Sequence, residues 1–462
     1  MSGLYTWAVS RVVFPLQETL KSHDTVRTRR DMEQSQWWDA QRLEALRLRR
    51  LQDLVMHAAN HVPYYRQLFS EHRIDAAALA SLADLHNLPL LSKPLIRQNF
   101  ERLKSERAGA VIRFNTGGSS GEPLVFLLGK ERVSHDVAAK WRATRWWGVD
   151  IGDPEIVVWG SPIELGAQDR MRAVRDTLMR TELLPAFEMS AGKLDQFVAR
   201  IRARRPRMLF GYPSSLALIA RHARSRGVRL DDLGARVAFV TAERLYDEQK
   251  QVISEAFACP VANGYGGRDA GFIAHQCPSG GMHITAEDII VETIDNQGRA
   301  TAPGVAGEIV VTHLATRDFP FIRYRTGDVG VLDTGACPCG RGLPLLKEVQ
   351  GRVTDFVVAA DGTVMHGLAL VYVLRELAGV EAFKIVQENL GLTRVLLVAA
   401  EAFPADGEAQ IREKFRRRLG AAVDVLVERV AEIPPERSGK YRYVVSNVAP
   451  GGGAGASAPA SS

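Results

Sequence analysis

Three short apolar runs, separated by segments with helical periodicity, constrain the fold of this chain more than any other feature of its sequence. The runs lie at 155–159, 207–211 and 236–240. Strands that alternate with helices in this way are typical of βαβ units, so we predict an α/β fold with a mostly parallel sheet. The chain has 462 residues, which is long enough for one large composite domain and a small one.

Different patterns flank this α/β region. Apolar residues recur at three- and four-residue steps from about residue 31 to 73, which predicts helices. From residue 284 the rhythm changes to closely spaced strands, at 289–292 and 308–312, and this indicates an antiparallel, barrel-like part. After residue 352 the order strand, turn, strand, helix, two strands and helix predicts a small α+β domain.

These patterns divide the chain into four expected regions. They are an N-terminal helical region at 1–84, a core at 85–352 with its barrel-like part at about 284–350, a C-terminal domain at 353–448, and a disordered low-complexity tail at 449–462.

Composition and charge exclude several classes of protein. Hydrophobic residues make up 46% and charged residues 24% of the chain, as in ordinary globular proteins. The net charge is only +6 and no nucleic-acid motif accompanies the arginine-rich stretches, so we expect no nucleic-acid partner. Four cysteines are too few for a secreted disulfide framework, and no apolar run reaches 18 residues, so we expect a cytoplasmic location.

The segment 4–16 is rich in aromatic and aliphatic residues and is broken by Pro15. It lacks the charged leader and cleavage site of a signal peptide. We expect it to dock on the body of the protein, and peripheral contact with a membrane surface is the alternative. The sequence leaves the oligomeric state open, with a homodimer as one alternative.

A loop rich in glycine and hydroxyl groups follows residue 115. It reads Thr116-Gly117-Gly118-Ser119-Ser120-Gly121, followed by Glu122 and Pro123. Glycine lets the backbone approach an anion, and its N–H groups, with serine and threonine hydroxyls, can bind phosphate oxygens. The spacing matches neither a P-loop nor a dinucleotide fingerprint. We predict that the loop holds the phosphates of a nucleoside triphosphate, and a flexible turn is the alternative.

Five further motifs follow in order, at 263–269, 307–308, 324–328, 351–355 and 438–440. Together with the glycine loop they resemble the adenylate-forming (ANL) superfamily, most closely its phenylacetate-CoA ligase and capsule-associated, CapK-like branch. The resemblance covers roughly residues 85–446. It implies an AMP-binding core, a mobile C-terminal domain and two half-reactions. A small carboxylic acid and ATP first give an acyl-adenylate and pyrophosphate, and the thiol of coenzyme A then takes the acyl group.

The resemblance also implies roles for single residues. Asp328 would bind both ribose hydroxyls, because a carboxylate has two acceptor oxygens, although T-G-D is also an ordinary turn sequence. Tyr265, followed by Gly266, would stack on adenine unless it is a core tyrosine. Asp269 stands where the family has the acid that helps to hold Mg²⁺, and Mg²⁺ needs few carboxylates when phosphate oxygens are present.

Lys440 would carry the first half-reaction, because an ammonium between the carboxylate and the α-phosphate offsets charge as pyrophosphate leaves. An exposed turn lysine is the alternative. Arg352 would contact ribose or phosphate, and Asp355 would be the hinge. Glu122 stands at or near the position where related ligases have a lysine. This departure leaves two alternatives open: transfer to an acceptor other than coenzyme A in capsule or exopolysaccharide biosynthesis, or a non-catalytic nucleotide-binding partner in that system.

Three cysteines and a histidine form a separate constellation. They are Cys277, His283, Cys337 and Cys339. Three thiols and an imidazole are the ligand set of a closed, structural Zn²⁺ site, and the resembled branch has a similar arrangement. Buried reduced cysteines with an unrelated histidine are the alternative, and His275 competes as the fourth ligand. We expect Cys259 to lie in the core.

The sequence says little about the acid pocket. Residues 211–215 and 241–243 lie at the ends of predicted strands, where α/β sheets bind ligands, although the first segment also reads as a helix start. The tryptophans Trp141, Trp146 and Trp147 either line a pocket or pack in the core.

Overall fold

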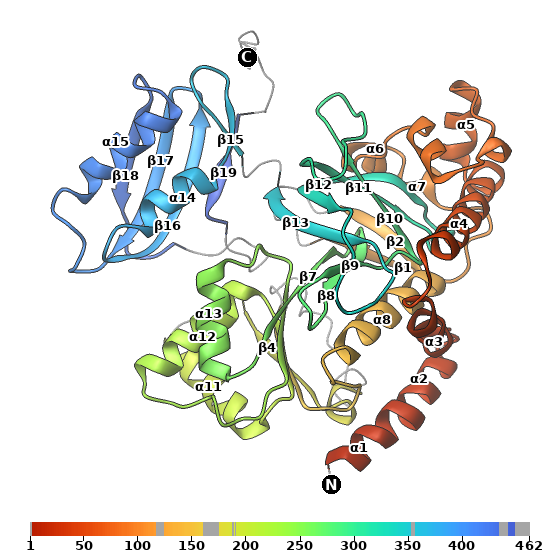
Figure 1. Ribbon diagram of the computed structural model, residues 1–462, viewed down its shortest axis with the longest axis horizontal. Coiled ribbons are helices and arrows are strands. Elements are labelled where there is room, and N and C mark those ends of the chain that lie inside the picture. The colour runs from red at the N-terminus through yellow and green to blue at the C-terminus, as the bar shows by residue number, and fades with distance from the viewer. Residues whose placement is uncertain are drawn as a thin grey trace. The chain divides into compact units, whose positions relative to one another are not determined.

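Figure 1 shows a computed structural model of the chain. It describes residues 2–116, 124–159, 175–186, 189, 191–352, 356–433 and 442–448. The described residues form two compact units. The larger comprises 2–326 and 330–350, and the smaller comprises 327–329, 351–433 and 442–448.

An eleven-stranded sheet, counted over the described residues, runs through the fold in the order β10-β11-β12-β13-β9-β8-β7-β6-β5-β3-β4. Its parallel part comprises β3 (Glu155–Trp159), β4 (Thr181–Pro185), β5 (Met208–Gly211), β6 (Val237–Thr241) and β7 (Val261–Gly267). All three apolar runs form strands of this part, and the α/β prediction is confirmed. The sequence pattern missed β4.

The remaining strands of this sheet begin with β8, which pairs antiparallel with β7. They are β8 (Gly271–Gln276), β9 (Met282–Ile284), β10 (Ile289–Ile294), β11 (Gly307–His313), β12 (Phe321–Asp333) and β13 (Leu345–Arg352). The predicted strands at 289–292 and 308–312 are β10 and β11, an antiparallel pair in which Val291 lies opposite Val311. A separate hairpin of β1 (Val111–Asn115) and β2 (Val125–Gly129) flanks the glycine loop.

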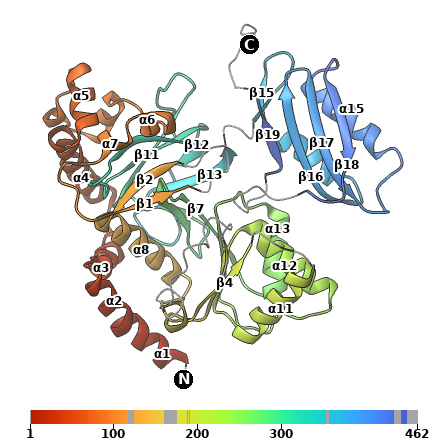
Figure 2. The same cartoon turned by 180° about the vertical axis from the view of Figure 1, so that it is seen from behind.

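Helices cover the sheet in two groups, which Figures 1 and 2 show from opposite sides. The first group is α11 (Ala191–Arg204), α12 (Pro213–Ser225) and α13 (Asp247–Phe257), packed beside the parallel strands around a buried cluster that includes Ile201, Leu216 and Val240. The second group lies by the antiparallel strands and includes α4 (Ala40–His61), α5 (Pro63–Glu71), α6 (Lys93–Gln98) and α7 (Phe100–Leu103).

The expected helical region at 31–73 forms three helices: α3 (Thr25–Ser35), α4 and α5. They are separate because Asp39 caps α4, accepting from the N–H of Arg42, and Pro63 starts α5. Before them lie α1 (Ser2–Ala8), a π-helical turn η1 (Val9–Val13) and α2 (Phe14–Leu20), and after them the two short 3₁₀ turns Ala76–Ala78 and Leu82–Asn87. No helix of the described segments is both long and apolar enough to cross a membrane.

The smaller unit has the predicted α+β order. A hairpin of β14 (Phe356–Val358) and β15 (Val364–His366) precedes α14 (Leu368–Arg375), β16 (Val380–Asn389), β17 (Leu392–Ala399) and α15 (Gly407–Leu419). Two strands that the sequence pattern missed, β18 (Asp424–Arg429) and β19 (Val444–Ser446), pair parallel with β17 and β16. Buried Gln387 links the hairpin to this sheet, because its amide both donates to and accepts from the backbone of Val358.

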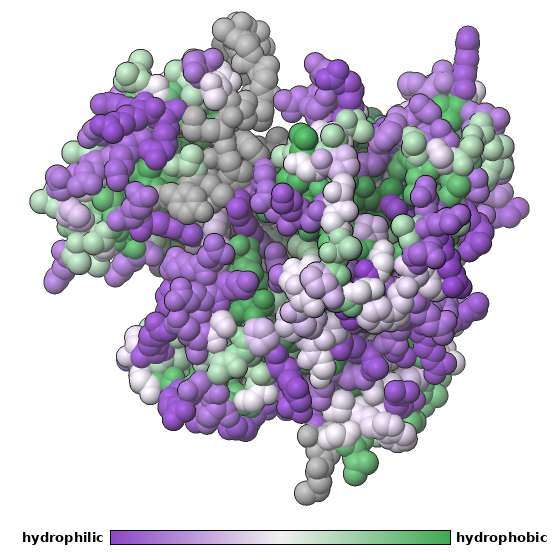
Figure 3. Space-filling model, viewed as in Figure 1, coloured by the Kyte–Doolittle hydropathy of each residue, from purple (hydrophilic) through white to green (hydrophobic). Residues whose placement is uncertain are grey.

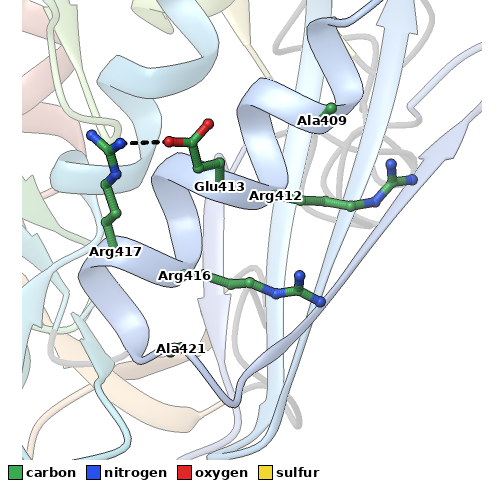
Figure 4. Close-up of a pocket in the computed structure, with 6 residues that line it drawn as sticks. All are labelled: Ala409, Arg412, Glu413, Arg416, Arg417 and Ala421. Carbon is green, nitrogen blue, oxygen red and sulfur yellow. Dashed lines mark hydrogen bonds and ion pairs between the residues drawn. The ribbon is translucent and has the colours of Figure 1, made fainter.

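A hollow of about 440 Å³ lies on α15, where Arg412 and Arg416 point away from the Glu413–Arg417 pair (Figure 4). Its arginines are engaged locally: Arg412 pairs with Glu408 at 3.0 Å, and Arg416 Nε donates to the carbonyl of Val423 at 3.1 Å. The arginine-rich end of α15 is thus a solvated helix face, as the interleaved sequence pattern indicates.

A buried ion pair fixes α8 (Lys130–Arg145) to the segment that precedes β10. Arg142 and Glu287 are each at most 2% exposed, and their Nη1 and Oε1 atoms lie 2.6 Å apart. Ser35 of α3 donates to the same carboxylate oxygen at 2.7 Å. Three segments far apart in sequence therefore share one desolvated charge pair, which tolerates the loss of neither partner.

We expect Glu287→Gln to lower the free energy of unfolding of the chain by about 3 kcal/mol, because it leaves the Arg142 charge buried without its counter-ion. Urea denaturation followed by circular dichroism measures this. Glu413→Gln is the matched control: its partner Arg417 is exposed, so we expect a change below about 0.5 kcal/mol. Equal losses in the two variants would contradict this account.

Candidate functional site

The turn between β7 and β8 places Asp269 at the end of two tightly packed strands. A Cβ atom on Gly266 would lie 2.3 Å from the carbonyl oxygen of Gly271, and one on Gly264 would lie 2.8 Å from the ring of Phe239. Both positions therefore need glycine for strand packing, whatever they bind. Tyr265, between them, is half-buried and packs on the large core of the antiparallel strands.

Three hydrogen bonds orient Asp269. Its Oδ2 accepts from the hydroxyl of Tyr324 at 2.5 Å, and its Oδ1 accepts from the N–H of Ala270 at 3.1 Å. Its carbonyl oxygen accepts from Arg132 Nη2 at 3.2 Å. The carboxylate is thus held by β12 and its backbone by α8. Tyr324 is fully buried. Sequence reasoning placed this tyrosine in a motif but gave it no function.

A buried network of charges supports Arg132. Its Nε donates to Asp136 Oδ2 at 2.7 Å, and the other oxygen of Asp136 lies 3.5 Å from His313 Nε2 of β11. Burial opposes ionisation of Asp136, but Arg132 and His313 hold the pKa of this carboxyl below its usual value. Burial, reinforced by the charge of Arg132, lowers the pKa of His313 to about 4. Sequence reasoning missed this network, and its one signal was the i, i+4 spacing of Arg132 and Asp136.

The neck of the glycine loop lies against the β7–β8 turn. Thr116 closes the neck, because its N–H donates to the carbonyl of Leu124 and its hydroxyl accepts from the N–H of that residue, both at 2.9 Å. Arg268 Nη1 donates to the carbonyl of Asn115 at 3.4 Å across 153 positions of sequence. Five expected ligands, Gly117, Gly118, Ser119, Ser120 and Gly121, lie outside the described residues, as does Glu122.

The 324–328 motif lies inside strand β12, so T-G-D is not a simple turn here. Thr326 donates from its hydroxyl to the carbonyl of Ile309 at 2.8 Å, and Gly327 has a φ of +80°. Asp328 follows on the same strand. Arg352 ends β13, but its side chain lies outside the described atoms, as do Asp355 and Lys440 entirely. The roles expected for these residues stay predictions.

The four expected metal ligands come together. The ligand atoms of Cys277, His283, Cys337 and Cys339 all lie within 4.8 Å of one another. Cys277 Sγ is 3.6 Å from Cys337 Sγ, and Cys339 Sγ is 3.2 Å from His283 Nε2. In a tetrahedral site, Zn–S bonds of about 2.3 Å place two sulfurs about 3.8 Å apart, so the cluster is close to the size that zinc requires.

The protonation states of His283 and Cys277 are compatible with a site for a cation. Burial lowers the pKa of His283 to about 4, so its ring is neutral at pH 7, and Nδ1 lies 3.4 Å from the carbonyl of Leu343. A proton on Nδ1 leaves the Nε2 lone pair facing Cys339. Burial and the neighbouring Cys337 thiol raise the pKa of Cys277 to about 11, so it would become a thiolate only beside a cation.

His275 and Cys259 lie outside the metal cluster. His275 lies against the rings of Phe239 and Phe272 and is outside the metal cluster, so the structure favours His283 as the fourth ligand. Cys259 is buried in the cluster around the parallel strands, which confirms that it is a core residue.

The candidate acid-pocket segments have structural partners. Glu243 accepts from the N–H of Ser214 at 3.2 Å, at the start of α12, which agrees with the helix-start interpretation of the 211–215 segment. Tyr212 stacks on Trp159 with ring centroids 4.4 Å apart. Trp141 is buried and Trp147 donates to the carbonyl of Gln276 at 3.0 Å, so both pack as scaffold.

Comparison with known proteins agrees with this architecture. Residues 357–447 match the family model of the CapK C-terminal domain. The chain is 22% identical to Protein CapK of Staphylococcus aureus over 414 residues, covering 87% of this chain and 89% of that protein. It is 26% identical to Phenylacetate-coenzyme A ligase of Thermus thermophilus over 330 residues, covering 69% and 72%.

Solved structures share the fold. The structure of 2-hydroxyisobutyryl-CoA ligase in its postadenylation state, in complex with R3-HIB-AMP, has a TM-score of 0.71 and 22% identity, covering 89% of this chain and 91% of that one. ATP-bound MatB from Rhodopseudomonas palustris has a TM-score of 0.52 and 17% identity, covering 72% and 66%. Residues 357–447 thus match the CapK C-terminal family, and over most of its length the chain is similar to the CapK-like and phenylacetate-CoA ligase-like members of the adenylate-forming superfamily.

Proposed function

We propose that this chain activates a carboxylic acid with ATP to an acyl-adenylate and transfers the acyl group to coenzyme A. The observation that carries the proposal is that the neck of the glycine loop contacts the turn that carries Asp269, whose carboxylate is bound by the buried tyrosine Tyr324. Thr116, Asp269 and Tyr324 come from three separate motifs of the adenylate-forming series, and contacts join the turn that carries Asp269 to both the neck and β12. Phenylacetate-coenzyme A ligases among the relatives support the choice of reaction.

Mg²⁺ would bind at Asp269. This carboxylate is anchored through one hydrogen bond to each oxygen, and a carboxylate oxygen with one donor keeps a lone pair for a cation. Mg²⁺ needs one or two carboxylates when phosphate oxygens complete its shell, so a single acid fits. The ion would offset the charge of the triphosphate. The chain itself fixes the direction of the carboxylate, because the Tyr324 hydroxyl cannot leave its buried position without losing its partner.

The other proposed roles follow the motif series. Gly117–Gly121 would bind phosphate oxygens through backbone N–H groups, Tyr265 with Gly266 would receive the adenine, and Asp328 would bind the ribose hydroxyls. Arg352 would contact ribose or phosphate. Lys440 would stabilise the charge that develops as the acid attacks the α-phosphate, and Asp355 would act as the hinge between the two half-reactions. No side-chain nucleophile is required, since coenzyme A supplies the thiol.

A second candidate is transfer of the acyl or adenylyl group to an acceptor other than coenzyme A. Two points favour it. The similarity to Protein CapK extends over most of both chains, and Glu122 is acidic at or near the position where the resemblance implies a lysine. A non-catalytic nucleotide-binding partner is a further alternative, and the presence of Lys440 and Asp328 in their motifs argues against it.

Acid-dependent exchange of pyrophosphate into ATP, measured over aryl, fatty and amino acids, tests the first half-reaction. We expect at least one acid to support exchange, and coenzyme A to increase AMP release with that acid. Lys440→Ala should slow exchange by about 10² or more, because a preorganised charge is lost. Lys414→Ala, which removes a half-buried lysine paired with Glu376, is the matched control and should leave exchange unchanged.

The outcomes separate the candidates. Exchange with AMP release that coenzyme A does not increase would contradict the thioester proposal and favour another acceptor. Absence of exchange with every acid would contradict the proposal that the chain forms an acyl-adenylate.

Tyr324→Phe tests the role of Asp269. We expect the Mg²⁺ concentration for half-maximal exchange to rise about tenfold, because the carboxylate loses the partner that aims it. The phenylalanine ring keeps the edge contact with Phe321, so stability should change little. Tyr65→Phe is the control, since its hydroxyl is equally buried but donates to the carbonyl of Pro320. Identical Mg²⁺ dependence in both variants would remove Tyr324 and Asp269 from the site.

We also propose that Cys277, His283, Cys337 and Cys339 hold a structural Zn²⁺. The unsubstituted protein, purified without chelator, should contain about one zinc per chain by elemental analysis. Cys277→Ser should lose most of the metal and melt at a lower temperature, because metal binding contributes directly to folding. Cys259→Ser removes a buried cysteine outside the cluster and should retain the metal. Less than about half an equivalent in the unsubstituted protein would count against the site.

A further inference from the structure

The helical segment α1–η1–α2 is docked on the protein along one face. Its docked side chains include Thr6, Val9, Ser10, Phe14 and Glu18, all buried. Phe14 meets the ring of Trp141 edge-on with centroids 5.1 Å apart, and Thr6 donates to Asp153 at 2.9 Å. A Cβ on Gly152 would come within 2.7 Å of Val9, so the contact is close. The segment therefore docks on the rest of the larger unit, as expected, and the face that carries these residues is buried there.

The opposite face of the same segment carries a line of large apolar side chains. Leu4, Trp7, Val12, Leu16 and Leu20, here called the outer stripe, are between 54% and 79% exposed. Figures 1 and 3 share one view, in which α1 and α2 form a rod at the edge of the molecule and hydrophobic side chains lie beside the N-terminal end. Scattered exposed apolar residues are ordinary, but five large ones within seventeen residues of one helical segment indicate a binding surface.

The π-helical turn η1 (Val9–Val13) keeps this stripe straight. A regular α-helix advances about 100° per residue, so the five residues from Trp7 to Val12 would turn Val12 well away from Trp7. A π turn closes its hydrogen bonds over i→i+5 and winds less per residue. Trp7 and Val12 therefore face the same way, and the docked residues Val9 and Phe14 stay together on the other face.

Two cationic side chains lie along the outer stripe. Arg11 lies within it and Lys21 at its end, and both are exposed. The one acid in the first 23 residues is Glu18, which is buried, accepts from Thr25, contacts His23 and pairs with Lys21 at 3.8 Å. The next acid along the chain is Asp24, which is exposed beyond the end of the stripe. Trp and Leu on a helix face with Lys and Arg beside them are typical of helices that lie in the headgroup region of a bilayer. Anionic headgroups complement Arg11 and Lys21.

We propose that the outer stripe binds the surface of a membrane that contains anionic lipids, with α1–η1–α2 lying in the plane of the interface. A second copy of the chain fits less well. Two antiparallel outer stripes related by a twofold axis would bring Arg11 of each copy to the centre, where like charges would meet without an acid between them. The proposal is independent of the reaction that the chain catalyses.

Sedimentation of the full chain with vesicles tests this, using phosphatidylcholine alone and phosphatidylcholine with phosphatidylglycerol at roughly 3:1, in about 0.1 M salt. We expect binding to the anionic vesicles. The double variant Trp7→Ser, Leu16→Ser should bind at least about tenfold more weakly, and Trp7→Phe should retain binding. The variant Arg11→Gln, Lys21→Gln should lose most of the preference for anionic vesicles.

The matched control is Val305→Ser, Leu426→Ser, which removes two apolar side chains of similar exposure that lie outside the stripe, and it should bind as the unsubstituted chain does. Circular dichroism and a thermal melt check that each variant is folded. Failure of the unsubstituted chain to sediment with anionic vesicles, or equal binding by the Trp7, Leu16 variant, would overturn the proposal. A dimer that this variant converts to a monomer, without vesicle binding, would assign the stripe to a second copy instead.

Discussion

The hydrogen bond from Tyr324 to Asp269 is the interaction on which the candidate site depends. It connects a buried strand residue to the carboxylate of the β7–β8 turn, so the direction of that carboxylate is set by the core. Arg132 holds the backbone of the same turn and is itself bound by Asp136. A carboxylate fixed from both sides loses little freedom when a cation arrives, which is how a preorganised site gains affinity.

Buried charge recurs throughout the larger unit and has a structural use. The pair of Arg142 and Glu287 joins α8 to the segment that precedes β10. The pair of Arg132 and Asp136 joins two successive turns of α8 itself. Desolvated pairs of this kind contribute little net stability, but they penalise any arrangement in which one partner is displaced. The metal cluster acts in the same region: His283 on β9 and the cysteines before β13 would link neighbouring strands through one ion.

Local sequence signals predicted the parts of the fold that local physics determines. The apolar runs at 155–159, 207–211 and 236–240 became strands, whereas β4 (Thr181–Pro185) is short, half polar and ends in proline, and gave no such signal. The cysteine and histidine cluster could be predicted because ligand chemistry allows few other uses for that set. Contacts of Tyr324 and Arg132 with Asp269 could not, because they join residues 55 and 137 positions apart. The π turn had no sequence signal either.

The most direct test of the central claim is a structure of the full chain with Mg²⁺ and a non-hydrolysable ATP analogue. The account predicts Mg²⁺ bound to an Asp269 oxygen at about 2.1 Å, or bridged to it by one water, with the β- and γ-phosphates beside the loop that follows Thr116. It also predicts that the Tyr324 hydroxyl stays on the carboxylate. A nucleotide bound elsewhere, or a magnesium ion in the phosphate site with no contact to Asp269 directly or through water, would contradict it.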